Sequence, residues 1–251
     1  DSAGRLYIVQ RGSSSITNFY NPFGQRMRKV SGSTTTYFVY DEAGQLLGEY
    51  DGAGAMLREY VWLGNRVVGL LSAQQPGKML QVHTDHLGTV RAVSDGSTVL
   101  WRWEGDQFGD VLPNEDADGN SQLFTMPLRH PGQYYDPESG LFYNYYRDYD
   151  PASGRYVESD PIGLRGGINT YGYVGGGPLI FIDYYGLAYS EAWKRMGGDA
   201  AGAFNDGGYN GYAEGVQAQK DAANAANRIT DNMSLNDKNN SSNAGTADAI
   251  R

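Results

Sequence analysis

The sequence predicts an all-β protein, an array of β-hairpins followed by a glycine-rich plug and a small tail that is mostly helical or disordered. Glycine supplies 35 of the 251 residues, about twice its usual share. Tyrosine supplies 20 residues, and 17 of these precede residue 188. Glycine costs a helix about 1 kcal/mol per position, whereas glycine in turns and tyrosine on pleated faces both favour short strands.

A recurring turn motif supports the hairpin array. The pattern Asp/Asn-x-x-Gly begins at Asp1, Asn21, Asp41, Asp51, Asp85 and Asp106. Aspartate at the first position and glycine at the fourth fit a type I turn that closes a hairpin with a bulge. Hairpins repeated at short intervals predict a stacked array in which each unit buries its face against its neighbours. Scattered hairpins of an ordinary sandwich are the alternative.

Segments of strand-like composition lie between these turns. They are rich in β-branched and aromatic residues, which favour pleated surfaces. They comprise residues 6–9, 36–40, 60–63 and 99–103. We therefore assign residues 1–131 to the hairpin array.

Residues 132–187 form a denser, glycine-rich segment with two internal echoes. Asp136-Pro137-Glu138-Ser139-Gly140 returns as Asp150-Pro151-Ala152-Ser153-Gly154, and Asp160-Pro161-Ile162-Gly163-Leu164 returns as Asp183-Tyr184-Tyr185-Gly186-Leu187. The many glycines allow backbones to approach closely. This segment is the predicted plug.

The composition changes sharply after Leu187. Residues 188–251 contain 14 alanines and 9 asparagines but only four valine, isoleucine and leucine residues together. So few bulky apolar side chains cannot offset the entropy of folding by themselves. Residues 214–229 have the composition of a helix, and residues 238–249 that of a disordered segment. We place a domain boundary at residue 187.

Charge and composition also exclude several classes of function. The net charge of −9 argues against a nucleic-acid groove spread over the whole surface. With no cysteine there is neither a disulfide framework nor a thiolate metal site. No apolar run approaches the roughly 20 residues that span a membrane.

Three segments of the sequence carry a family resemblance. Residues 132–187 resemble the core-associated region of Rhs proteins, also called YD-repeat proteins. His83-Thr84-Asp85-His86-Leu87-Gly88-Thr89 is similar to the DHLGT segment of that family, and Tyr60-Val61-Trp62-Leu63-Gly64 to its YxWLG segment. The resemblance implies the closing third or less of a hollow β-shell, or cocoon, that encloses a C-terminal toxin.

The two echoed aspartates are the candidate catalytic residues. Asp160 and Asp183 lie 23 residues apart, and each is followed by x-x-Gly-Leu. Two carboxyl groups that share a proton can act as acid and base in peptide hydrolysis. The resemblance implies that this pair cuts its own chain between Leu187 and Ala188. Supporting motif residues are Pro161, Gly163, Leu164, Pro178 and Gly186, and no cofactor or metal is expected.

The chain departs from the family pattern around both aspartates. Tyr184 stands where the second motif usually has proline, and its loss is expected to loosen the geometry and slow cleavage. Ser159 precedes Asp160 where some relatives carry arginine, so we expect charge assistance from Arg155 or Arg165.

Four other groups of residues admit a binding role beside a structural one. His83, Asp85 and His86 are of metal-ligand types, but they lie on one of the turns of the array and no further ligand accompanies them, since His130 is the only other histidine. Gly166-Gly167-x-Asn169 resembles a phosphate loop but lacks the strand and helix that accompany one. Tyrosines 145, 146, 171 and 173 suit sugar stacking or the lining of a shell. Arg26, Arg28 and Lys29 form a basic cluster that we interpret as a solvated face.

The resemblance implies an effector made in the cytoplasm and delivered to target cells, by type VI secretion, in bacterial competition or host intoxication. Its implied partners are its own toxin as cargo, a cognate immunity protein, and a secretion-apparatus tip or adaptor chaperone. A non-cleaving structural or carbohydrate-binding surface protein and the C subunit of an insecticidal toxin complex remain alternatives.

Overall fold

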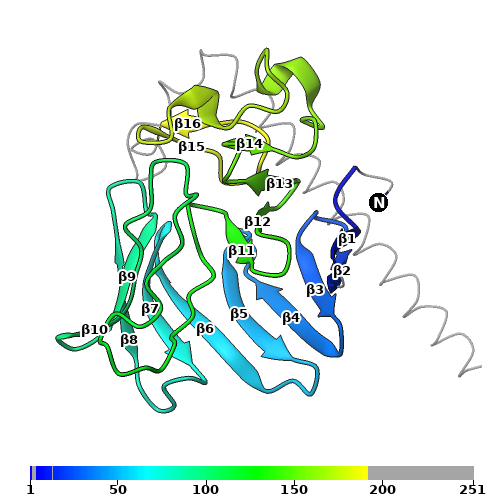
Figure 1. Cartoon of the computed structure of the whole chain (residues 1–251). Helices are drawn as coiled ribbons and strands as arrows, with labels where there is room; N and C mark the ends of the chain where they lie inside the picture. Colours follow the sequence, from blue (N-terminus) through cyan, green and yellow to red (C-terminus); the bar gives the residue numbers. More distant parts are fainter. Residues whose placement is uncertain (2–3, 13, 192–251) are drawn as a thin grey trace, which may run out of the picture. The chain divides into compact units, whose positions relative to one another are not determined.

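The computed structural model describes residues 1, 4–12 and 14–191, so the expected helix at 214–229 and the expected disorder at 238–249 lie outside the described residues. Ten strands form one antiparallel sheet in chain order. They are β1 (Ile8–Arg11), β2 (Ser14–Tyr20), β3 (Arg26–Ser31), β4 (Thr34–Tyr40), β5 (Leu46–Asp51), β6 (Met56–Leu63), β7 (Arg66–Ser72), β8 (Leu80–Thr84), β9 (Val90–Asp95) and β10 (Thr98–Arg102). Figure 1 shows this curved sheet, which confirms the hairpin array.

The six predicted turns have the expected conformation. The fourth residue of each is a glycine with φ between +78° and +93°. Its amide donates to the carbonyl of the first residue at 3.0–3.2 Å. Only glycine adopts this left-handed conformation without a steric cost, so the motif determines where the chain reverses.

The face of the sheet that carries the core follows from strand alternation. Phe38 in β4 is 4% exposed, whereas Tyr37 and Val39 on either side of it are 40% and 45% exposed. Side chains alternate between the two faces of a strand, so the buried face of the sheet includes Phe38 and, further along the sheet, Tyr60 of β6 and Leu70 of β7. This face packs in one cluster with Tyr134 and other residues of the later segments.

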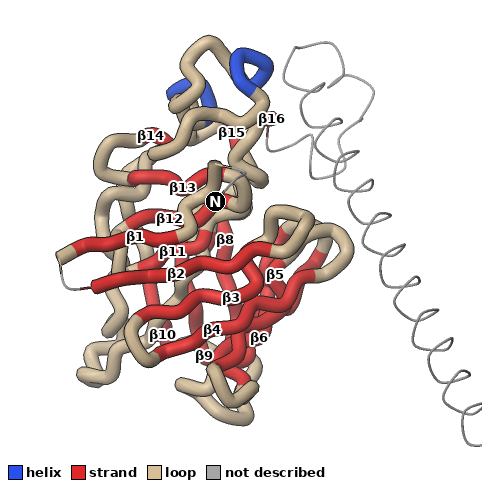
Figure 2. Tube along the Cα trace, turned by 90° about the vertical axis from the view of Figure 1, so that its right-hand side faces the viewer, coloured by secondary structure: helices blue, strands red, loops and turns tan. Residues whose placement is uncertain are grey.

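A second antiparallel sheet follows in the chain. It consists of β11 (Tyr134–Asp136), β12 (Leu141–Asn144), β13 (Arg147–Asp150) and β14 (Arg155–Tyr156). Two short 3-10 helices, η1 (Gly163–Gly166) and η2 (Val174–Gly176), and a hairpin of β15 (Phe181–Ile182) and β16 (Ser190–Glu191) complete the described part. Figures 1 and 2 agree in placing β13 to β16 beyond one end of the long strands.

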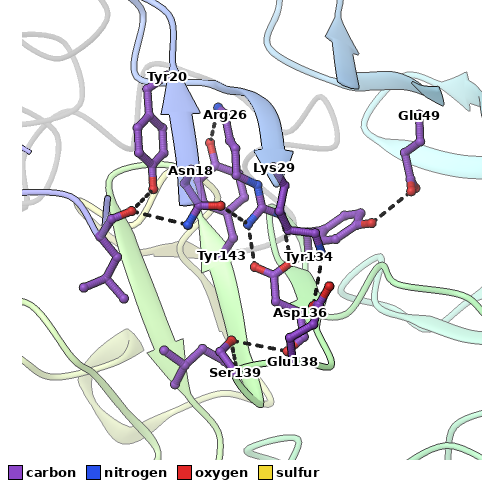
Figure 3. Close-up of polar contacts among 12 residues, drawn as sticks. Asn18, Tyr20, Arg26, Lys29, Glu49, Tyr134, Asp136, Glu138, Ser139 and Tyr143 are labelled. Carbon is purple, nitrogen blue, oxygen red and sulfur yellow. Dashed lines mark hydrogen bonds and ion pairs between the residues drawn. The ribbon is translucent and has the colours of Figure 1, made fainter. Parts of the chain in front are cut away.

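The predicted solvated basic face is wrong, because Arg26 and Lys29 join the two sheets. Arg26 is fully buried and Lys29 is 6% exposed. Arg26 Nη1 lies 2.5 Å from Asp136 Oδ2, and Lys29 Nζ lies 2.9 Å from Asp136 Oδ1 (Figure 3). The register with β2 shifts at Met27, and this bulge turns Arg26 and Lys29 to the same face of the sheet.

The Arg26 guanidinium also lies over aromatic rings of both sheets. Its Cζ is 4.8 Å from the ring centroid of Phe38 and 4.4 Å from that of Tyr143. The Arg26 amide donates to the Tyr143 hydroxyl at 2.9 Å. These contacts fix the second sheet, which carries part of the candidate site, against the first.

Candidate active site

The structure brings Asp160 and Asp183 together around one arginine. Arg147, the first residue of β13, places Nη2 3.0 Å from Asp160 Oδ2 and 3.1 Å from Asp183 Oδ2. Asp160 is 6% exposed and Asp183 is 2% exposed. The return of the chain through β15 therefore places the two echoed aspartates in a common buried cluster.

The predicted cleavage bond lies in a loop that starts at Asp183. Because Phe181 pairs with Glu191 and Ile182 pairs with Ser190, residues 183–189 form the loop of a hairpin. Asp183 Oδ1 accepts a hydrogen bond from the Leu187 amide at 3.0 Å. The Arg147 Nε donates to the Gly186 carbonyl at 2.5 Å. Arg147 and Asp183, which pair with each other, thus also hold the loop around the Leu187–Ala188 bond.

Gly166 brings the carbonyl of that bond close to Asp160. A Cβ atom at position 166 would overlap Asp160 Oδ2 and would lie 2.6 Å from the Leu187 carbonyl oxygen. The two oxygens therefore flank the same small space, which a side chain would fill. Gly166 ends η1, so the short helix after Asp160 returns to cover the site.

The electrostatics of Asp160 suit a proton donor. Burial raises the pKa of Asp160 to about 6, against the opposing effects of Arg147 and of the Ile162 amide, and the Asp183 charge adds to the increase. The Ile162 amide donates to Asp160 Oδ1 at 2.9 Å, which leaves Oδ2 directed at Arg147. A carboxyl group with such a pKa holds its proton in about half of the molecules at pH 6 and in about a tenth at pH 7, far more than an ordinary aspartate.

Asp183 is surrounded by donors from the second sheet. The Tyr156 hydroxyl donates to Asp183 Oδ2 at 2.9 Å. Burial, followed by the Asp183 charge, raises the pKa of Tyr156 well above its usual value, so the hydroxyl keeps its proton. Asn144 Nδ2 donates to the Asp183 carbonyl at 3.0 Å and to the Tyr156 hydroxyl at 2.9 Å. These bonds orient the Asp183 carboxylate.

The prediction that Arg155 or Arg165 is the charge partner of Asp160 was wrong. The structure places Arg147 there, whereas Arg155 is exposed and its guanidinium lies 5.7 Å from the Tyr171 ring; Arg165 is exposed as well. Arg147 is the one basic residue between positions 132 and 154. A lone arginine in an aromatic strand beside several acidic residues was the available signal, because such a strand is buried and its charge needs a partner.

The departures from the family pattern leave the aspartates together. Tyr184 is 5% exposed, and its ring centroid lies 5.7 Å from that of Tyr145 and 5.0 Å from that of Tyr185. Tyrosine thus contributes packing where proline would restrict φ. The effect of this exchange on the rate of cleavage stays a prediction.

The remaining motif residues occupy different environments. Gly163 has φ +63° and its amide donates to the Asp160 carbonyl at 2.9 Å, so it closes the turn after the aspartate. Pro178 and Gly186 are buried and Pro161 is exposed. Leu164 is 75% exposed, whereas its counterpart Leu187 is 7% exposed. Only the second leucine is packed into the site.

The other candidate sites have structural partners. His83 Nε2 bonds Ser94 Oγ at 2.8 Å, Asp85 pairs with Arg91 at 3.0 Å, and His86 Nε2 bonds the Leu179 carbonyl at 3.0 Å. The carboxylate and carbonyl oxygens beside Gly166 would repel a phosphate at the suggested loop. Tyr145 and Tyr173 are 4% and 3% exposed, which hides both rings from a sugar.

The family model of the Teneurin YD-shell matches residues 1–165. The chain is 54% identical over 196 residues to the probable deoxyribonuclease RhsB of Dickeya dadantii, a match that covers 75% of this chain and 13% of RhsB. It is 46% identical over 107 residues to the toxin protein Tse5 of Pseudomonas aeruginosa, covering 42% of this chain and 8% of Tse5. The chain thus spans only a small part of these relatives.

Solved structures share the fold. The complex TcdB2-TccC3-TEV matches with a TM-score of 0.55 and 19% identity over 74% of this chain and 10% of that chain. Within the described residues no helix is long and apolar enough to cross a membrane. The YD-shell model matches residues 1–165 of the 251, and the relatives described above are Rhs and toxin proteins. The chain therefore belongs to the YD-shell family, as part of a shell of the Rhs/YD-repeat polymorphic toxins.

Proposed function

We propose that this shell encapsulates a C-terminal toxin and cuts its own chain once, between Leu187 and Ala188, with Asp160 and Asp183 as the catalytic pair. One observation carries the proposal: a single nitrogen of Arg147 contacts both carboxyl groups, while Asp183 and Arg147 hold the backbone of residues 186 and 187. Residues 1–131 are then the shell, residues 132–187 the plug that ends in the cleavage site, and residues 188–251 the beginning of the toxin.

The chemistry follows from the surroundings of each carboxyl group. Asp160, whose pKa is about 6, gives its proton to the Leu187 carbonyl oxygen beside Gly166. Asp183 takes a proton from a water molecule, and the water oxygen attacks the Leu187 carbonyl carbon. The tetrahedral intermediate then collapses: the proton held by Asp183 moves to the Ala188 nitrogen, the C–N bond breaks, and one hydroxyl of the intermediate returns its proton to Asp160. One water is consumed, leaving a carboxylic acid on Leu187 and a free amine on Ala188, and transfer of a proton from the acid to the amine gives a carboxylate and an ammonium group.

The biological role we propose is delivery of the toxin into competitor or host cells. Tse5 is named a toxin protein and RhsB a probable deoxyribonuclease, and both are similar to this chain over part of their length. A protein of this kind acts with a cognate immunity protein and a secretion-apparatus tip or adaptor chaperone, in a type VI system. Encapsulation keeps the toxin from its own cell until the shell is delivered.

The non-cleaving, sugar-binding alternative lacks a comparable site. Of the four tyrosines considered for sugar stacking, Tyr145 and Tyr173 are buried among other rings. Sugar rings stack on exposed aromatic faces, so Tyr145 and Tyr173 are better explained as packing of the plug, whereas Tyr171 is 40% exposed.

Intact mass and gel analysis of the 251-residue chain tests the proposal. We expect two fragments, the second beginning at Ala188, in the wild type, and a single uncut chain in Asp160→Asn and in Asp183→Asn. Asp110→Asn, at an exposed position, is the matched control and is expected to cut normally. A wild-type chain that stays whole after long incubation contradicts self-cleavage.

A further inference from the structure

A second pair of carboxyl groups, one buried and one half-buried, lies next to the site. Asp148 follows Arg147 in β13 and is 4% exposed. Its amide donates to Glu158 Oε2 at 2.7 Å, and the two carboxyl side chains are themselves hydrogen-bonded. Glu158 Oε1 is buried and has no hydrogen-bond partner among the described residues. The catalytic steps proposed above use neither carboxyl group.

Glu158 extends the pairing of β13 and β14 toward Asp160. The ladder pairs Asp150 with Arg155 and Tyr149 with Tyr156, and then the Val157 amide donates to the Asp148 carbonyl at 2.9 Å. The Glu158 side chain accepts from the next free amide of β13, where a backbone carbonyl would otherwise stand. Two residues later, Asp160 meets Arg147. The Glu158 contact therefore ties the segment that carries Asp160 to the strand that carries its partner.

The surroundings favour one proton on this pair. Burial, and then the charge of Glu158, raises the pKa of Asp148 well above its usual value, and burial raises the pKa of Glu158. Arg26 of β3 opposes the increase at Asp148, but its guanidinium is already paired with Asp136 of β11. The other ionisable groups that face the pair are Tyr20 of β2, Tyr143 of β12 and Arg147 of β13. Two ionised carboxylates in this setting would repel each other with little screening.

We propose that Glu158 is a positioning residue for Asp160, and that it acts as half of a carboxyl pair that shares one proton with Asp148. With the proton present, the pair holds residues 157–160 on β13. When the proton is lost at alkaline pH, repulsion drives the Glu158 side chain away, and Asp160 leaves its place beside Arg147. The inference deepens the proposed function and rests on it.

Substitutions at the two positions separate tethering from mere packing. Glu158→Ala removes the acceptor, and we expect self-cleavage to slow by about 10- to 100-fold, because a small misplacement of a reacting group costs that much. Glu158→Gln and Asp148→Asn each keep an amide–carboxylate hydrogen bond, so the rate at pH 6 is expected to stay within about threefold of the wild type. Glu104→Ala, at an exposed acid of 72% side-chain exposure, is the control and should change nothing.

The pH profile gives a readout that packing would not move. Above the pKa of Asp160 the wild-type rate should first fall by about tenfold per pH unit and then, once the pair ionises, by about a hundredfold per unit. Glu158→Gln and Asp148→Asn should keep the shallower fall throughout, because neither can place two charges at this position. Equal slopes in all three proteins would overturn the shared-proton role.

Infrared spectroscopy tests the proton without relying on cleavage. In the uncut Asp160→Asn chain near pH 7.5 we expect a carbonyl band of a protonated carboxylic acid that disappears when Asp148→Asn or Glu158→Gln is added. If the spectra of these proteins do not differ, the shared proton is refuted. If the wild type cuts but Glu158→Ala cuts equally fast, the positioning role is refuted and the proposed function stands. If the wild type never cuts, both the proposed function and the positioning role fail, and the band alone decides whether the proton is shared.

Discussion

Arg147 and Asp160 form a buried ion pair, with Nη2 3.0 Å from Oδ2, and the same nitrogen reaches Asp183 at 3.1 Å. One cation between two carboxyl groups offsets part of their repulsion and fixes their separation. Arg147 also bonds the Gly186 carbonyl next to the predicted cleavage bond. Its planar guanidinium makes these contacts in different directions at once.

Arg147 should therefore determine the rate of self-cleavage. A lysine ammonium cannot reach both carboxylates and the Gly186 carbonyl with fixed geometry, so we expect Arg147→Lys to slow cutting by about tenfold or more and Arg147→Met by about 100-fold or more. The rate is measured after rapid refolding of denatured chain, by intact mass against time. Arg155→Met, at an exposed arginine, is the control. Cutting by Arg147→Met at the wild-type rate would falsify this role.

Gly166→Ala should block the site sterically. The added methyl group would overlap Asp160 Oδ2 and crowd the Leu187 carbonyl oxygen, so Asp160 must move, and we expect a rate loss of about 100-fold. Gly52→Ala is the matched control, since its Cβ would meet Thr35 only at an ordinary 3.4 Å. The same refolding assay compares both variants. Unchanged cutting by Gly166→Ala would show that the oxygens at Gly166 take no part in the reaction.

Self-cleavage should slow as the pH rises through about 6. Burial raises the pKa of Asp160 to about 6, and the proposed step needs the protonated acid. Below this pKa most molecules hold the proton, and above it the competent fraction falls by about tenfold per pH unit. Refolding into a series of buffers between pH 5 and 9 gives the profile. A rate that increases with pH across this range would assign the ionised form of Asp160 to the reaction instead.

The Arg26–Asp136 pair should be important for stability. Asp136→Asn leaves a fully buried guanidinium without its carboxylate, which typically costs about 3–5 kcal/mol. Urea unfolding of the uncut Asp160→Asn chain, with and without Asp136→Asn, measures the difference. Asp95→Asn breaks an exposed pair with Lys78, of 39% and 50% exposure, and should cost less than about 1 kcal/mol. Equal losses from the two substitutions would contradict the buried role of Arg26.

The same pair predicts loss of stability in acid. Although burial raises the pKa of Asp136, Arg26 and Lys29 outweigh it and hold the pKa below its usual range. A lowered carboxyl pKa contributes stability above the unfolded value, near 4, and this contribution is lost as the pH falls through the lower folded value. The unfolding free energy of the Asp136→Asn chain should therefore vary less between pH 5 and pH 2 than that of its parent.

Much of the described fold was predictable because its determinants are local. Gly44 and Gly88, for example, occupy left-handed turns that the Asp-x-x-Gly pattern requires. Period-two alternation around Phe38 identifies the buried face of β4. The echoed motifs identified Asp160 and Asp183 as candidates, although the two aspartates make different local contacts: Asp160 Oδ1 accepts from the Ile162 amide and Asp183 Oδ1 from the Leu187 amide.

The partners of these residues were not predictable in the same way. Arg26 was predicted to belong to a solvated basic patch. In the structure a bulge at Met27 directs its side chain toward Asp136, 110 residues along the chain. Arg155 and Arg165 were predicted to pair with the Asp160 carboxylate because they are near it in sequence, yet Arg147 forms that ion pair. Which charge meets which depends on how β13 and the β15–β16 loop pack, and no short-range pattern encodes that.

The amino-acid sequence alone is therefore sufficient to predict the hairpin turns and the all-β class and to identify the two echoed aspartates, because turn and strand preferences act over a few residues. Only the tertiary structure decided that Arg147 joins the aspartates, that Gly166 admits the Leu187 carbonyl, and that Glu158 pairs with Asp148. These contacts depend on burial, which forces each charged group to find a partner wherever the packed chain supplies one.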